Sequence, residues 1–229
     1  ALAHVALVSL ARYADPVTRA PVDPAGAVDR LVDWRTRLAA RSRPRVWGKF
    51  IPSWKQRFAR TFFGSGGDPL VYDDKRPVER AAAIGAEVLY WGNRDAVAMK
   101  EAARAHPAQP AVVQAEDGFV RSIGLGRDLA VPASWVLDDL GIYYDGTRPS
   151  RLERILETED FDAATLARAR RLRETIRGAG ISKYNVMGRP FERPAAAGDR
   201  PVVLALGQVP EDLSLRDGLS PFGGDAVAF

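Results

Sequence analysis

The pattern of apolar and polar positions predicts an α/β fold from about residue 68 onward. Apolar runs at residues 86–91 and 111–115 predict two strands, and a helical repeat at residues 95–105 connects them. A strand, a helix and a strand within about 30 residues form a right-handed parallel crossover. Because parallel sheets bind their ligands at the carboxyl ends of the strands, we expect a site beside residues 91–94 and 116–119.

Two helices are predicted within the first 45 residues. The segment ALAHVALVSLARY is rich in alanine and leucine, and a second helix is expected from about residue 25 to residue 40. Apolar residues recur along this second helix at helical spacing and form its apolar side. They are Val28, Leu31, Val32 and Leu38. The pattern alone therefore predicts a helical N-terminal extension in front of the α/β region.

The last third of the chain predicts two helices, a linker and a third strand. Residues 150–153, Ser-Arg-Leu-Glu, form a capping box, so a helix begins there. A further helix is expected at about residues 163–177, and residues 187–200 are rich enough in proline, glycine and alanine to predict a linker. The apolar run at residues 201–206 predicts a buried strand. Its polar end, residues 207–214, is a third strand end with candidate functional groups.

The composition excludes several kinds of site. The 229 residues contain no cysteine, so disulfides, thiolate metal sites and cysteine nucleophiles are excluded. His4 and His106 are the two histidines, so we expect neither a histidine-rich metal site nor a serine-type triad. No apolar run approaches the ~20 residues of a membrane-spanning helix, and we expect no secretory signal at the start of the chain.

The net charge of +4 is unevenly distributed. Nine Lys and Arg residues and no acids lie within residues 34–67, interleaved with Trp and Phe. Trp54, Phe58 and Phe62 share one helical face, which predicts that the basic residues of this helix point elsewhere. Those basic residues are Lys55, Arg57 and Arg60.

Three interpretations of the basic and aromatic segment at residues 34–63 remain open. It is a helix that faces the core and has a solvated basic side, or a patch that binds an anionic membrane surface through Trp, Phe and positive charge. Nucleic acid is ranked last, because no recognition motif accompanies the patch, and we expect no nucleic-acid partner. The membrane contact would use Arg43, Arg45, Lys49 and Lys55.

Residues 116–150 organise the rest of the chain. This stretch combines acids, an arginine and glycines in a segment too irregular for a helix, which is typical of a site carried on loops. Its motifs EDGFVRS, GLG and LDDLGIYYD, followed by RPSRLE, resemble the capsule polysaccharide synthesis and export proteins. Members of that family are retaining β-Kdo glycosyltransferases, which start the Kdo linker of Gram-negative capsules.

The resemblance implies a fold and a division into domains. We expect a Rossmann-like parallel sheet from a GT-B-type glycosyltransferase, truncated and preceded by a helical extension. Residues 46–198 would form the acceptor-side domain, and residues 199–229 would begin the donor-side domain. Because members of the family often carry two transferase modules in tandem, residues 1–45 are the tail of a preceding module or a simple extension. The chain would then be a piece of a longer protein.

The resemblance also implies an activity. The enzyme would transfer β-linked Kdo from CMP-Kdo to a lipid-anchored acceptor, with retention and by double displacement, and it would need no cofactor. We expect it in the cytoplasm, at the surface of the inner membrane. The alternative is a non-catalytic capsule assembly or export factor that binds glycolipid. Because a His-Pro motif and a Ser/Gly-rich loop for CMP are missing after residue 212, we expect the 229-residue chain alone to be inactive.

Double displacement needs a carboxylate nucleophile and a base that deprotonates the acceptor hydroxyl. Asp212 occupies the position of the acid in the family's Gln-x-x-x-Asp segment, so it is the expected nucleophile; a helix N-cap is its structural alternative. Gln208 begins this segment and Ser214 follows it, and both are expected to bind substrate. Glu116 is the expected base or acceptor contact. The alternative for Glu116 and its neighbour Asp117 is that both cap a loop.

Adjacent residues of an extended strand point in opposite directions, so Glu116 and Asp117 cannot both face one cleft. Asp117 is counted among the substrate-binding residues, although one of the two acids would instead hold the loop through backbone hydrogen bonds. Arg121 and Arg94 are expected to bind the sugar carboxylate or the phosphate, because a guanidinium binds such groups through two hydrogen bonds. Tyr144 would line the acceptor side. Gly118 is counted among the substrate-binding residues, although a tight backbone turn also explains it. The pair Asp138-Asp139 is too weak a signal for Mg²⁺, so we expect no metal.

Overall fold

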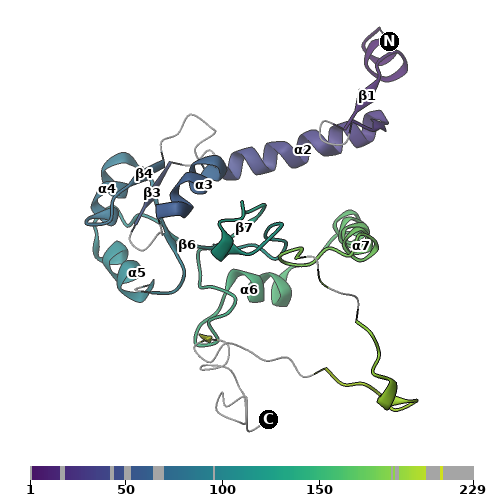
Figure 1. The fold of residues 1–229 in the computed structure, drawn as a ribbon. Coiled ribbons are helices and arrows are strands. Elements are labelled where there is room, and N and C mark those ends of the chain that lie inside the picture. Colours follow the sequence, from purple (N-terminus) through teal and green to yellow (C-terminus); the bar gives the residue numbers. More distant parts are fainter. Residues whose placement is uncertain are drawn as a thin grey trace.

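The computed structural model describes most of the chain and shows how the strands are ordered (Figure 1). It describes residues 2–15, 19–41, 44–48, 53–63, 70–94, 96–186, 188, 191–204 and 212–213. The elements in chain order are α1 (Leu2–His4), the π-helix η1 (Val5–Ser9), β1 (Tyr13–Ala14), β2 (Pro21–Val22), α2 (Pro24–Arg41), β3 (Arg45–Trp47), α3 (Ser53–Phe63), β4 (Leu70–Tyr72), α4 (Pro77–Ile84), β5 (Glu87–Trp91), α5 (Ala96–Ala105), β6 (Val112–Asp117), the 3-10 helix η2 (Gly126–Asp128), β7 (Trp135–Asp138), α6 (Arg151–Thr158), α7 (Ala163–Gly178) and the 3-10 helix η3 (Ala195–Ala197).

A five-stranded sheet forms the framework. Its order is β4-β3-β5-β6-β7. The first four strands are parallel, and β7 pairs with β6 in the antiparallel direction. The crossover from β5 through α5 to β6 confirms the strand, helix and strand predicted from the sequence. The sequence pattern missed β7 and, on the other side of the sheet, β3 and β4, which are three residues long.

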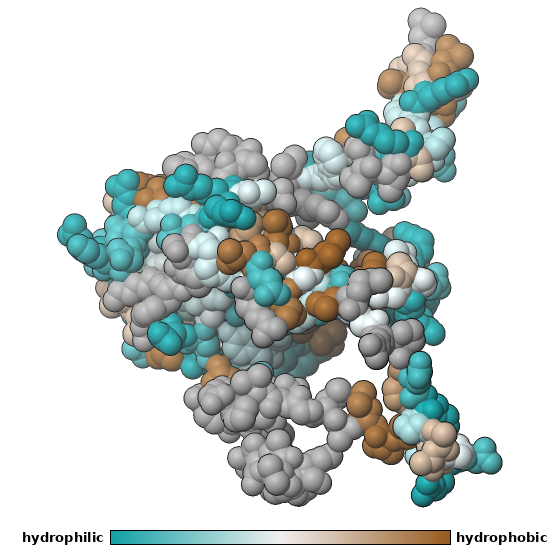
Figure 2. All heavy atoms as spheres, viewed as in Figure 1, coloured by the Kyte–Doolittle hydropathy of each residue, from teal (hydrophilic) through white to brown (hydrophobic). Residues whose placement is uncertain are grey.

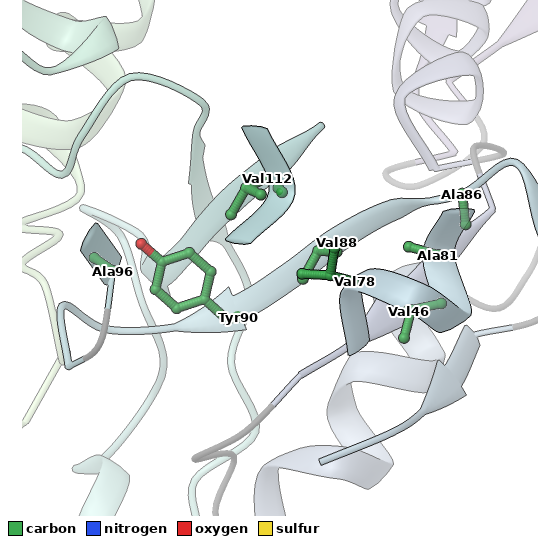
Figure 3. Packing of buried hydrophobic residues seen from close by; sticks show 9 residues of the cluster. Val46, Val78, Ala81, Ala86, Val88, Tyr90, Ala96 and Val112 are labelled. Carbon is green, nitrogen blue, oxygen red and sulfur yellow. The ribbon is translucent and has the colours of Figure 1, made fainter. Parts of the chain in front are cut away.

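Helices cover both faces of the sheet because both sets of alternating side chains are apolar. Val88 and Tyr90 of β5 point to one face, where they pack with α4 and α5 residues such as Val78 and Ala96 (Figure 3). Leu89 lies on the opposite face, in a cluster supplied largely by aromatic side chains. That cluster includes Trp47, Phe62, Phe63, Tyr72, Trp91 and Trp135. The sheet is therefore the middle layer of a three-layer α/β/α arrangement.

The aromatic face of α3 belongs to this core, which confirms the core-facing interpretation of the helix. Phe58 and Phe63 are 6% and 5% exposed. The prediction that Lys55 points away from the aromatic face is wrong, since it is 7% exposed and lies over the ring of Trp91. Arg57 and Arg60 are exposed as expected.

Two of the four residues expected to contact a membrane are buried in this domain, which corrects that part of the membrane hypothesis. Lys55 lies within the core, and Arg45 is 3% exposed and donates a 2.6 Å hydrogen bond to Glu87. Lys49 and Arg43 lie outside the described residues. Among the described residues, no helix is long and apolar enough to cross a membrane.

The N-terminal segment lies apart from most of the sheet (Figure 1). The strands β1 and β2 pair with each other, and α2 confirms the helix expected at residues 25–40. Several apolar residues of α2 are exposed, including Leu31 at 66%. An ion pair of 2.8 Å between Arg168 of α7 and Asp33 of α2 connects this helix with the C-terminal part of the chain.

The C-terminal predictions have mixed outcomes. The capping box at Ser150 is confirmed, and α7 confirms the helix expected at residues 163–177. The strand expected at residues 201–206 is wrong where it is described: Pro201–Leu204 has no strand conformation, and Val203 is 87% exposed. An apolar run becomes a strand when a neighbouring strand takes its backbone hydrogen bonds, and no described strand pairs with this one.

Candidate functional site

The last two residues of β6 carry the carboxylates on which the site is built. Alternation along the strand places Glu116 on the face of Gln114, which receives a hydrogen bond from Lys100 of α5. Asp117 lies on the opposite face, toward α3. The two side chains thus point to opposite faces of the strand, as predicted, and each carboxylate has its own set of partners.

Glu116 is held by two hydrogen bonds. Its Oε1 accepts from the backbone N–H of Asp117 at 2.9 Å, and its Oε2 accepts from the hydroxyl of Tyr144 at 3.1 Å. Burial raises the pKa of Glu116, and the neighbouring Asp117 adds to this effect, while the hydrogen bonds and the positive charge of Lys55 oppose it. A carboxyl whose pKa is raised and whose geometry is fixed suits a general base.

Tyr144 lies against Glu116, and its place on the acceptor side stays a prediction. Its hydroxyl donates to Glu116, and burial together with the charge of Glu116 raises the pKa of Tyr144. Tyr144 therefore stays neutral and remains a hydrogen-bond donor at ordinary pH. Its ring contacts Tyr143 edge to face at 5.4 Å between centroids, and Tyr143 in turn contacts Phe119 at 5.0 Å.

Asp212 lies close enough to this tyrosine cluster to affect it. Burial raises the pKa of Tyr143 to about 12, and the negative charges of Glu116, Asp117 and Asp212 contribute to the rise. Asp212 is half-buried. Glu116 and Asp212, the expected base and the expected nucleophile, thus both contribute negative charge at Tyr143, although they lie far apart in the sequence. Gln208 and Ser214 lie outside the described residues.

Asp117 is paired with two buried cations. Its Oδ1 lies 3.2 Å from Nε of Arg121 and 3.8 Å from Nζ of Lys55. Arg121 has no exposed surface, and its Nη1 donates to the hydroxyl of Ser122 and to the carbonyl of Ala130. Its predicted contact with a sugar carboxylate stays a prediction, and its position shows that it holds Asp117 and the loop together.

Two glycines permit the close packing around this ion pair. A Cβ atom at Gly126 would lie 3.1 Å from Nη2 of Arg121, so a larger residue would press on the guanidinium. A Cβ atom at Gly118 would collide with Ser134, whose carbonyl accepts the N–H of Gly118 at 3.0 Å. The close approach to Ser134 explains Gly118, which is not among the glycines with positive φ, and its contact with substrate remains a prediction.

Lys55 is the site residue that the sequence analysis did not recognise. Its Nζ lies 3.1 Å from the centroid of the Trp91 ring and 5.2 Å from that of Trp54. Burial lowers the pKa of Lys55 to about 8, although the carboxylates of Asp117 and Glu116 favour its charged form. The signal in the sequence was weak, because a lysine beside an aromatic helical face is usually solvated.

Other expected residues stand at the edge of this arrangement. Arg94 is exposed in the turn after β5. Its neighbour Asn93 points inward, donating at 2.8 Å to Asp145. Asp138 accepts three backbone N–H groups, and Asp139 forms a two-bond ion pair with Arg151. In the part of the chain that is described, no group of three or more His, Asp or Glu side chains could hold a metal ion, and the absence of a metal remains a prediction.

A segment distant in sequence completes the loop that follows β6. The carbonyl of Lys183 accepts the N–H groups of Arg121 and Ser122, and the carbonyl of Tyr184 accepts that of Gly124 at 2.7 Å. Asn185 donates to the carbonyl of Ser122 at 3.0 Å. The Ser-Lys-Tyr-Asn sequence at residues 182–185 thus fixes the backbone next to the site.

Apolar surface borders the site. In Figure 2 it gathers near the centre of the view, over β7 and neighbouring loops. Residues 119–131 contribute several exposed apolar side chains, including Phe119 at 55% and Ile123 at 86%. Exposed apolar surface of this kind commonly marks an interaction surface.

The fold and the site define the class: a Rossmann-like α/β domain that gathers carboxylates and tyrosines at the carboxyl edge of its sheet. Residues 86–229 match the family model described as capsule polysaccharide biosynthesis protein. The chain belongs to this family. The resemblance inferred from the motifs between residues 116 and 153 is confirmed.

Individual relatives agree with this assignment. The capsule polysaccharide modification protein LipA of Neisseria meningitidis is 31% identical over 218 residues, which cover 93% of this chain and 30% of LipA. The lipopolysaccharide-processing protein LpsZ of Rhizobium meliloti is 39% identical over 132 residues, or 56% of this chain and 29% of LpsZ.

A solved structure supports the fold. The β-Kdo 2,7 transferase KpsC of Thermosulfurimonas dismutans is 32% identical, with a TM-score of 0.51 over 76% of this chain and 51% of that chain. The α/β fold with a parallel sheet is therefore as predicted, and it is consistent with part of a GT-B-like glycosyltransferase. This chain spans about 30% of the length of LipA.

Proposed function

We propose that this chain contributes the acceptor-side part of a glycosyltransferase that adds β-linked Kdo from CMP-Kdo to a lipid-anchored acceptor. A role in capsule polysaccharide biosynthesis follows from the family. The donor, the acceptor and retention of configuration are the proposed parts, supported by the similarity to a β-Kdo transferase. A peripheral location at the inner membrane, where the acceptor would lie, belongs to the same proposal.

The observation that carries the proposal is the Glu116 carboxylate fixed against Tyr144, with the negative charge of Asp212 acting on the neighbouring Tyr143. Glu116 accepts a hydrogen bond from Tyr144. The negative charge of Asp212 contributes to the raised pKa of Tyr143, the residue that precedes Tyr144. Two carboxylates near one cluster are what a two-step transfer requires, since one attacks the sugar and the other removes a proton.

The proposed reaction has two displacements. In the first, the Asp212 carboxylate attacks the anomeric carbon of Kdo, and CMP leaves with the electron pair of the broken C–O bond. In the second, the acceptor hydroxyl attacks that carbon and loses its proton to Glu116, which releases Asp212. Tyr144 keeps Glu116 in place, and no cofactor takes part.

Mass spectrometry of the intact full-length protein with CMP-Kdo tests this scheme. Wild-type protein without acceptor should gain the mass of one Kdo residue. Asp212→Ala should give no adduct and should lower transfer by about a thousandfold or more. Glu116→Gln should still form the adduct and accumulate it, because the base is needed in the second step.

Asp160→Ala serves as the control, since this exposed acid lies far from β6 in the sequence and should leave transfer unchanged. Adduct formation by Asp212→Ala would refute the nucleophile assignment. A wild-type protein that binds the glycolipid acceptor, yet forms no adduct and transfers no sugar, would favour the non-catalytic assembly factor.

A further inference from the structure

Lys55 occupies a position that a solvated surface lysine would not take. It projects from α3 and is 7% exposed, with Nζ 3.1 Å from the Trp91 ring centroid and 3.8 Å from Asp117 Oδ1. The ring of Trp54 lies on another side at 5.2 Å. A cation enclosed by two indole rings and a carboxylate is fixed in place, because each contact favours the ammonium where it is.

The charged groups around Lys55 come from β6 and the loop after it. The carboxylates of Asp117 and Glu116 attract the ammonium, and the guanidinium of Arg121 repels it. From α3 itself and from β5, it meets the rings of Trp54 and Trp91, which do not titrate. Burial disfavours the charged form most strongly, so the ammonium depends on the two carboxylates.

The two carboxylates depend on Lys55 in turn. Glu116 and Asp117 are adjacent at a half-buried strand end, where the negative charge of Asp117 disfavours ionisation of Glu116. Arg121 is directed at Asp117. Lys55 interacts with both acids, and its charge favours the ionised form of Glu116.

We propose that Lys55 is a positioning residue of the transferase site, which clamps Asp117 at the end of β6 and supplies positive charge to the Glu116–Asp117 pair. This inference rests on the proposed function, in which Glu116 acts as the base. Lys55 acts through the carboxylates and does not touch the acceptor. Its removal should therefore change the pH at which the base becomes active.

The test compares variants of the full-length protein by the pH dependence of kcat/KM for the acceptor. Lys55→Met keeps the length of the side chain and removes its charge. The pH below which kcat/KM falls, the acid limb of the profile, should rise by about one pH unit. At a pH below this limb, kcat/KM should be about tenfold lower than that of the wild type. Lys55→Arg keeps a positive charge and should retain the wild-type limb. Arg57→Met removes a charge from the exposed side of the same helix and should change nothing.

A second variant acts in the opposite direction. Asp117→Asn removes the neighbouring negative charge and leaves Lys55 present, so its acid limb should move down. If Lys55→Met fails to fold, as judged by circular dichroism, Lys55→Arg and Asp117→Asn still decide the matter. An unmoved limb in Lys55→Met or in Asp117→Asn, or a limb raised by Lys55→Arg, overturns the inference. A wild-type protein without transfer at any pH refutes the proposed function instead.

Discussion

At the residue scale, buried charges near the end of β6 make stability depend on pH. The pKa of Lys55 is lowered to about 8 in the folded chain, from 10.5 when unfolded. Between these values the unfolded state binds more protons, so rising pH favours folding. The contribution of Lys55 to stability is therefore present above the unfolded pKa and is lost as pH falls through about 8.

We predict that the free energy of unfolding of the wild-type chain rises relative to that of Lys55→Met between pH 8 and pH 9.5. The difference should grow by up to about 1 kcal/mol per pH unit. Urea unfolding at several pH values measures it. The window ends below pH 10. Above that pH the chain loses stability, because tyrosines such as Tyr143, whose pKa burial raises, ionise in the unfolded state first. A constant difference across the window would contradict the assignment of a lowered pKa to Lys55.

Gly118 illustrates a second effect at this scale, the close approach of two backbones. A methyl group at this position would collide with Ser134, so Gly118→Ala should destabilise the chain by about 2 kcal/mol. Thermal unfolding checks this prediction. Gly178→Ala is the control: an added Cβ meets nothing within 4 Å at the end of α7, and the change should be neutral or slightly stabilising. Equal effects of the two substitutions would refute the steric explanation.

At the element scale, the start of α6 was predictable because a capping box is local. Ser150 accepts from the N–H of Glu153 at 3.2 Å, and Glu153 accepts from the N–H of Ser150 at 2.7 Å. Both interactions depend on side chains three residues apart, so no tertiary information is needed to expect them.

We predict that Ser150→Ala lowers the free energy of unfolding by about 1 kcal/mol, because it removes one half of the reciprocal cap. Arg154→Ala, an exposed change on the same helix, should alter it by less than about 0.5 kcal/mol. Urea denaturation compares the two variants. A Ser150→Ala protein as stable as Arg154→Ala would show that the cap is energetically unimportant.

The strands divide into those with a strong apolar pattern and those without one. The strands β5 and β6 were predicted because their side chains are apolar on both faces, as expected for parallel strands inside an α/β layer. The strand β7 was read as part of an irregular stretch. It pairs antiparallel to β6, and its Trp135–Asp138 sequence shows no pattern that distinguishes it from a loop.

At the scale of the whole molecule, the family assigns the chain a role in capsule polysaccharide biosynthesis. The chain spans about 30% of the length of LipA. In the proposed transferase, residues outside the described sheet would bind the donor.

We therefore predict that the 229-residue chain transfers no Kdo from CMP-Kdo, whereas a protein of the relatives' length does. A radiolabelled or mass-spectrometric transfer assay with both proteins at equal concentration measures this. Circular dichroism of the chain is the control for folding, because an unfolded chain would be inactive for another reason. Detectable transfer by the chain alone would contradict the prediction.

The sequence by itself determined the family, the parallel crossover and the start of α6, because motifs and helix caps are properties of neighbouring residues. It also indicated that Glu116 and Asp117 diverge, since alternation along a strand is local. Tertiary structure decided which partners each acid has. Lys55, Arg121 and Tyr144 come from three different segments, and only the packing of α3 against the sheet shows that a lysine expected in water is buried against Trp91 beside Asp117.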